Sequence, residues 1–199
     1  VYRGKIRTGG HSKGGNLAVY SAVFVPKEIR DRVIRVYSND GPGFVEEVVN
    51  SLEFKEMDDR IITIVPQSSV VGMLLCRGSH LEVVESTVRN GLMQHDPFTW
   101  QVMGKEFVHL PAMSPTGKKH DEVFREWLGK LDAEKRKEFT DIFFGVLEST
   151  GAKTVSDLSQ DQLPKLLVAA RTFGSLGKEE RDVLTEFTRG LFDAIKKQG

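Results

Sequence analysis

The feature that most constrains this chain is a Gly-x-Ser-x-Gly motif at residues 10–14, set between a strand pattern and a helix pattern. Residues 5–8 alternate in polarity, and small and apolar side chains recur at helical spacing from residue 17 to residue 25. This context predicts a sharp strand-to-helix turn, a nucleophile elbow, that raises the Ser12 hydroxyl above a sheet edge. Gly10 and Gly14 supply the small residues that such a turn needs. The alternative is an ordinary glycine-rich turn in which Ser12 only caps the helix.

The pattern after the motif predicts an α/β fold. Residues 33–38 are β-branched and mostly apolar, as in a buried parallel strand, and they follow the predicted helix at the spacing of a βαβ unit. Residues 60–65 predict the clearest strand, and residues 81–86 predict the last strand of the sheet. Apolar residues at helical spacing over 45–54 predict one short amphipathic helix.

Asp40 is the candidate acid of a catalytic triad. It follows the predicted strand at 33–38, at the sheet edge where catalytic groups of open α/β sheets collect. A carboxylate there could orient a histidine and stabilise its cation. The alternative is an Asx-turn residue in a Gly/Pro loop. The loop after the next strand, residues 66–69, contains no carboxylate, which leaves Asp40 as the better candidate and also favours the alternative of a scaffold without catalysis.

His95 is the candidate general base, because it lies on the loop after the predicted last strand. The alternative is a structural histidine that packs beside Trp100. Asp96 is expected to cap a helical turn that begins at Pro97. The competing histidines are poorly placed: one adjoins the serine, one precedes the last strand and two lie beyond the loop (His11, His80, His109 and His120).

Three motifs together carry a resemblance to a known family. Residues 10–18, Gly-His-Ser-Lys-Gly-Gly-Asn-Leu-Ala, look like the nucleophile elbow of lipase-type α/β-hydrolases. With Asn-Asp-Gly-Pro-Gly-Phe at 39–44 and Gln-His-Asp-Pro-Phe-Thr-Trp at 94–100, they are similar to an uncharacterised bacterial family of lipase-like α/β-hydrolases. The resemblance covers about residues 5–103.

The resemblance implies a fold class and an oxyanion hole. The chain would be the C-terminal part of an α/β-hydrolase, with a mostly parallel sheet flanked by helices, followed by an all-helical C-terminal segment. The backbone N–H of Lys13, next to the serine, would stabilise the oxyanion. In this fold several strands precede the nucleophile strand, and here the motif comes after about ten residues. We therefore expect the chain to belong to a longer protein.

The composition limits the classes of binding partner that we expect for this chain. Lys and Arg total 28 and Asp and Glu total 28, so charge gives no reason to expect binding to nucleic acid or to an anionic membrane. No apolar run is long enough for a membrane span. The single cysteine, Cys76, fits a reducing, cytoplasmic location, although a signal peptide could precede this chain. The scattered histidines do not predict a metal site, and no cofactor is expected.

The domain prediction has three parts. Residues 1–110 form a partial α/β-hydrolase domain, residues 111–118 have the composition of a linker, and residues 119–199 form a helical bundle or cap. Four apolar stripes at helical spacing support the helical segment. This segment could act as a cap, a homo-oligomer contact or a partner-binding module.

Two functions from different classes remain open. The first is a serine hydrolase of lipase or esterase type that cleaves a small-molecule or lipid ester through an acyl-enzyme on Ser12, with His95 as base and Asp40 as acid. The second is a catalytically silent hydrolase-like scaffold that serves as a binding module through its helical C-terminal segment.

Overall fold

The chain forms two compact units, residues Val1–Arg125 and Glu126–Gly199. The computed structural model describes residues 3–89, 91, 93–119, 121–122, 134–135, 137, 174–175, 177–178, 181 and 185. The helical bundle expected over residues 119–199 therefore lies almost wholly outside the described residues. Within the described part, no helix has both the length and the apolar character needed to cross a membrane.

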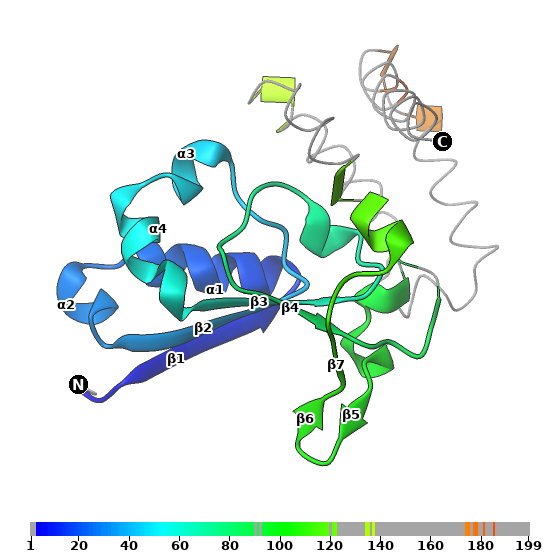
Figure 1. Ribbon diagram of the computed structural model, residues 1–199. Helices are drawn as coiled ribbons and strands as arrows, with labels where there is room; N and C mark the ends of the chain where they lie inside the picture. Colours follow the sequence, from blue (N-terminus) through cyan, green and yellow to red (C-terminus); the bar gives the residue numbers. More distant parts are fainter. Residues whose placement is uncertain are drawn as a thin grey trace. The chain divides into compact units, whose positions relative to one another are not determined.

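The first unit is a mixed α/β structure around a mostly parallel sheet, as expected (Figure 1). The sheet order is β1-β2-β3-β4-β7, and the first four strands run parallel. Their bounds are β1 (Ile6–His11), β2 (Val33–Asn39), β3 (Ile61–Pro66) and β4 (Leu81–Val84). These strands lie where the alternating and β-branched patterns predicted them. Their carboxyl ends share one edge, where the candidate side chains follow.

The sheet does not end at β4. Strand β7 (His109–Leu110) pairs antiparallel with β4, so the prediction that residues 81–86 form the last strand is wrong. A hairpin of β5 (Val102–Met103) and β6 (Glu106–Phe107), with Gly104 at φ 66°, was not predicted. Strands of two residues are too short to show an alternating pattern.

The helices gather against the first strands (Figure 1). Helix α1 (Lys13–Phe24) follows β1 directly, and α2 (Lys27–Arg30) leads into β2. The single helix predicted over 45–54 is wrong. It is divided into α3 (Glu46–Val49) and α4 (Leu52–Met57), because Ser51 is extended and its hydroxyl accepts a hydrogen bond from the Phe54 N–H, which begins a new helix.

The two faces of the sheet carry separate apolar clusters, because successive strand residues point to opposite sides. Val36 packs with α1 residues such as Val23 and with Phe54 of α4. On the other face, Ile64 packs with Val84 and Trp100. The Trp100 side chain also contacts the loop that carries His95, because its Nε1–H donates to the Gln94 carbonyl at 2.8 Å.

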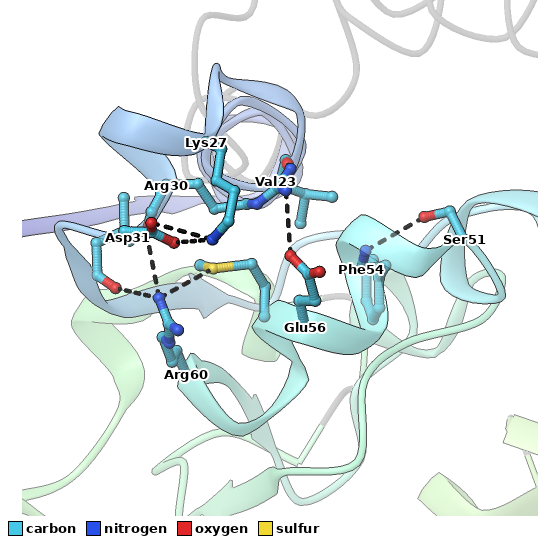
Figure 2. A network of polar contacts seen from close by, with 10 residues as sticks. Val23, Lys27, Arg30, Asp31, Ser51, Phe54, Glu56 and Arg60 are labelled. Carbon is cyan, nitrogen blue, oxygen red and sulfur yellow. Dashed lines mark hydrogen bonds and ion pairs between the residues drawn. The ribbon is translucent and has the colours of Figure 1, made fainter.

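A polar network joins the helical layer to the amino ends of the strands (Figure 2). The Arg30 guanidinium donates to the Val23 carbonyl at 3.0 Å and pairs with Glu56 at 3.1 Å. Arg60, in the short 3-10 helix η1 (Asp58–Arg60), donates to the carbonyls of Arg30 and Val33 at 3.2 and 3.0 Å. These contacts satisfy carbonyls at the end of α2 and the start of β2, at the opposite end of the sheet from Ser12.

The segment expected to be a linker, 111–118, lies within the first unit and contacts the end of β3. The Ser114 N–H donates to the Gln67 carbonyl at 2.8 Å, and the Ser114 and Ser68 hydroxyls lie 2.6 Å apart. Residues 115–119 are helical, and Ser114 caps them by accepting from the Gly117 N–H. A Cβ added at Gly117 would lie 2.4 Å from the Gln67 carbonyl oxygen, so this approach requires glycine.

Candidate active site

Ser12 occupies the turn between β1 and α1 in a backbone conformation that few residues other than glycine adopt. Its φ is 56° and its ψ is −131°. The Ser12 N–H donates to the Asn39 carbonyl of β2 at 2.9 Å, and its own carbonyl accepts from the Gly15 N–H at 2.9 Å. Non-glycine residues at positive φ are uncommon, and such strain is concentrated at functional sites. Contacts on both sides of the turn therefore hold Ser12 in a strained position.

The glycines around Ser12 have different roles. A Cβ added at Gly10 would lie 2.4 Å from the carbonyl carbon and oxygen of Gly14, and one at Gly15 would lie 2.8 Å from the Ser38 hydroxyl. A Cβ at Gly14 would meet nothing within 4 Å. The expectation that Gly14 must itself be small is therefore wrong. The close approaches are made at Gly10 and Gly15, where β1 meets the first turn of α1.

Asp40 is completely buried, at the loop after β2. Its Oδ1 accepts hydrogen bonds from the Ser69 hydroxyl and from the Gly72 N–H, the latter at 3.1 Å. Its Oδ2 lies 2.7 Å from Nδ1 of His95. These partners come from distant parts of the chain rather than from the turn that contains Asp40. The carboxylate therefore connects the loops after β2, β3 and β4.

His95 closes the short 3-10 helix η3 (Met93–His95), and 5% of its surface is exposed. Because the Asp40 carboxylate can only accept, Nδ1 of His95 carries the proton in this contact. A neutral His95 then has its lone pair on Nε2, the form that a general base requires. Asp96 accepts from the Phe98 N–H at the start of η4 (Pro97–Thr99), as predicted.

His11 links Ser12 to His95, because it precedes Ser12 in the chain and its side chain contacts His95. Nε2 of His11 lies 2.7 Å from the His95 carbonyl oxygen, and the two imidazole centroids are 4.5 Å apart. Among the described residues, no hydrogen bond joins the Ser12 hydroxyl to the His95 ring. Catalytic hydrogen bonds are often long before substrate binds, so the arrangement is compatible with general-base chemistry.

Two amide side chains that the sequence did not indicate hold the loops of this site. Gln94 is 1% exposed; its Oε1 accepts from the Ser68 N–H at 2.8 Å, and its Nε2 donates to the Val88 carbonyl at 2.8 Å. Asn16 of α1 donates to the carbonyls of Pro42 and Gly43 at 3.1 and 2.9 Å, in the loop that follows Asp40. Both residues lie within the motifs quoted above, but their residue types alone do not indicate these contacts.

Lys13 is the first residue of α1, so its N–H has no acceptor within the helix. The N-terminal end of a helix also carries a partial positive charge, which favours an anion nearby. The Lys13 side chain is exposed. A Cβ added at the neighbouring Gly14 would meet nothing within 4 Å, so the space beside this first turn of α1 is open. The position of Lys13 fits the expected oxyanion donor.

The other histidines lie elsewhere. His80 pairs with Asp59 at 3.7 Å, and His109 pairs with Glu82 at 3.7 Å. His120 lies outside the described residues. In the part of the chain that the structure describes, no three His, Cys, Asp or Glu side chains come together as metal ligands would. The expectation that no metal or cofactor is used remains a prediction.

Comparison with known proteins gives a family. The family model of the Mbeg1-like proteins matches residues 1–145 of the 199-residue chain, a span that contains β1–β7 and all the site residues described above. No curated protein and no solved structure gave a match. Because the family model covers well over half of the chain, this protein belongs to the Mbeg1-like family.

Proposed function

We propose that this chain contains the catalytic residues of a serine hydrolase of lipase or esterase type, and that its sheet is the C-terminal part of an α/β-hydrolase fold. The observation that carries the proposal is the buried pair of Asp40 and His95 beside the strained Ser12. A nucleophile, a base and an acid that orients the base are the three parts of a catalytic triad. They occur here in the chain order Ser, Asp, His, which is the order of this fold.

The proposed reaction has two stages. The Ser12 Oγ attacks the ester carbonyl while Nε2 of His95 takes the hydroxyl proton, and the oxyanion is stabilised by the Lys13 N–H. The carbon–oxygen bond to the alcohol then breaks, and His95 returns the proton to the departing alkoxide. In the second stage His95 takes a proton from a water molecule that attacks the acyl carbon. The bond from that carbon to Ser12 Oγ then breaks, and His95 passes the proton to Oγ as the carboxylic acid leaves.

Asp40 has a defined part in each stage. It keeps the proton of His95 on Nδ1 and stabilises the imidazolium that forms at each proton transfer. The Ser69 hydroxyl and the Gly72 N–H saturate the other carboxylate oxygen, so Oδ2 remains directed at His95. Ser69 lies on the loop where many lipases carry the acid, and here it donates to an acid from the preceding loop.

A fluorophosphonate probe tests the proposal. Such a probe phosphonylates only an activated serine, so the folded full-length protein should be labelled and Ser12→Ala should abolish the labelling. Ser79→Ala is the matched control, because Ser79 is exposed on the loop before β4 and its side chain is not part of the site. Hydrolysis of short p-nitrophenyl esters should follow the same pattern.

Absence of labelling in folded full-length protein would overturn the hydrolase proposal. It would favour the alternative prediction, a silent scaffold that binds partners through the C-terminal segment. Labelling that persists in Ser12→Ala would place the reactive serine elsewhere in the chain. A subunit contact through the C-terminal segment and a cytoplasmic location stay predictions.

A further inference from the structure

His11 has no role in the proposed triad, yet it makes the direct contact between the serine turn and the histidine loop. Its Nε2 lies 2.7 Å from the His95 carbonyl oxygen across 84 residues of sequence. The two rings lie with centroids 4.5 Å apart and planes tilted by 35°. One side chain therefore contacts both the backbone and the ring of the proposed base.

The position of His11 follows from strand register. His11 is the last residue of β1 and lies opposite Asn39 of β2, one residue before Asp40. It also immediately precedes Ser12. A movement of the His11 side chain relative to its strand would therefore change the spacing between the nucleophile turn and the base.

The hydrogen bond defines the protonation of His11. A carbonyl oxygen only accepts, so Nε2 of His11 carries a proton. Burial lowers the pKa of the His11 imidazole below its ordinary value of 6.5, although the hydrogen bond to the His95 carbonyl opposes this. The charged and titratable groups that act on His11 are His95, Asp40 and Asp96. At neutral pH the ring beside His95 is therefore uncharged.

We propose that His11 is a positioning residue for His95, and this inference rests on the proposed hydrolase function. Its Nε2–H anchors the backbone of the base at a set distance from Ser12, and its neutral ring lies beside the imidazolium that His95 becomes. Displacing a catalytic group by about 1 Å can reduce the rate by about 10²-fold. A cation at residue 11 would oppose protonation of His95.

Two substitutions separate the donor from the ring. His11→Phe keeps an aromatic ring and removes the N–H donor, whereas His11→Gln keeps an amide N–H that can reach the His95 carbonyl. The control is His80→Gln, because His80 is exposed and pairs with Asp59 away from the site. Fluorophosphonate labelling rates and p-nitrophenyl ester kinetics are measured for each, together with the thermal midpoint Tm.

We expect His11→Phe to lower kcat and the labelling rate by about tenfold or more, because the anchor is lost while the ester site is unchanged in KM. We expect His11→Gln to recover most of the rate, to within about threefold of the wild type, and His80→Gln to match it. Rescue by glutamine together with a kcat effect at constant KM would not arise from a purely structural role.

Three outcomes would overturn the inference. Equal, wild-type rates in both variants would show that His11 does not position the base. Equal losses in both variants that follow the loss of Tm would assign it to packing alone. If the wild type is not labelled, the hydrolase proposal fails and this inference fails with it. ¹⁵N spectra that still show a neutral His11 with its proton on Nε2 would then show that the contact with the His95 carbonyl exists and that the serine hydrolase chemistry is what failed.

Discussion

Replacing Asp40 by asparagine should remove the proposed hydrolase activity with little change in the fold. The amide oxygen of the introduced side chain could still accept from the Ser69 hydroxyl and the Gly72 N–H, as Oδ1 of Asp40 does. The other branch would become an NH2 group facing Nδ1 of His95, where the wild-type distance is 2.7 Å. Two N–H groups cannot bond to each other, so His95 would be held with its proton on Nε2. That nitrogen could then no longer accept the Ser12 proton.

The magnitude follows from this tautomer change. In a serine triad, holding the histidine in the wrong tautomer lowers kcat by about 10⁴, which is about 5 kcal/mol of transition-state stabilisation. The assay is initial-rate hydrolysis of a short p-nitrophenyl ester by Asp40→Asn, with KM expected to stay near the wild-type value. The matched control is Asp31→Asn. Asp31 is a surface carboxylate that takes no part in the site, and its pKa is lowered by a hydrogen bond from Lys27.

A kcat for Asp40→Asn within tenfold of the wild-type value would refute this reasoning. It would mean that the buried contact between Asp40 and His95 is structural and that another group orients the base. A similar loss in Asp31→Asn would also refute it, because the partner of Asp31 is Lys27 and not a residue of the site.

Three further predictions concern stability. Gly10→Ala should lower the free energy of unfolding by about 3 kcal/mol, because the alanine Cβ would lie 2.4 Å from the Gly14 backbone. Gly14→Ala should leave it nearly unchanged. Urea denaturation measures both variants, and equal effects would contradict the packing described. Arg60→Ala should lower the free energy of unfolding by about 2 kcal/mol, because two carbonyls lose a charged donor. Arg35→Ala, at an exposed position, should lower it by less, and equal losses in the two variants would count against this reasoning. The pKa of His11 is lower in the folded chain than in the unfolded chain, so the unfolded chain binds a proton on this imidazole at a higher pH. The stability that the neutral His11 side chain contributes is therefore fully present above pH 6.5 and is lost as the pH falls below it. Tm should fall less between pH 7.5 and 5 in His11→Phe than in the wild type, and an equal fall in both would contradict this.

Much of the architecture could be predicted because its patterns are local. The strands at 33–39 and 61–66 are β-branched runs, and small and apolar residues recur at helical spacing from residue 17 to residue 25 in the helix after Ser12. The short elements could not be predicted. Ser51 divides one expected helix into two. Strands β5 and β6 pair with each other over only two residues each, and β7 depends on β4, a partner that is remote in sequence.

Ser12 could be nominated from the Gly-x-Ser-x-Gly motif, and Asp40 and His95 from their places after predicted strands, since the ends of parallel strands meet at one edge. The residues that hold them could not. Gln94 and Asn16 are polar residues in or beside loops, and their roles depend on a Ser68 N–H and on two loop carbonyls that only the folded chain brings within reach.

Local sequence patterns were enough to predict the order of the four parallel strands and helix α1, and to place Ser12, Asp40 and His95 after strands, because periodicity and glycine spacing are properties of neighbouring residues. Only the tertiary structure decided which groups touch. The contacts of Asp40 with His95 and of His11 with the His95 carbonyl span 55 and 84 residues. Contacts of this kind depend on sheet register and on the burial of each polar group with a partner, which no local pattern records.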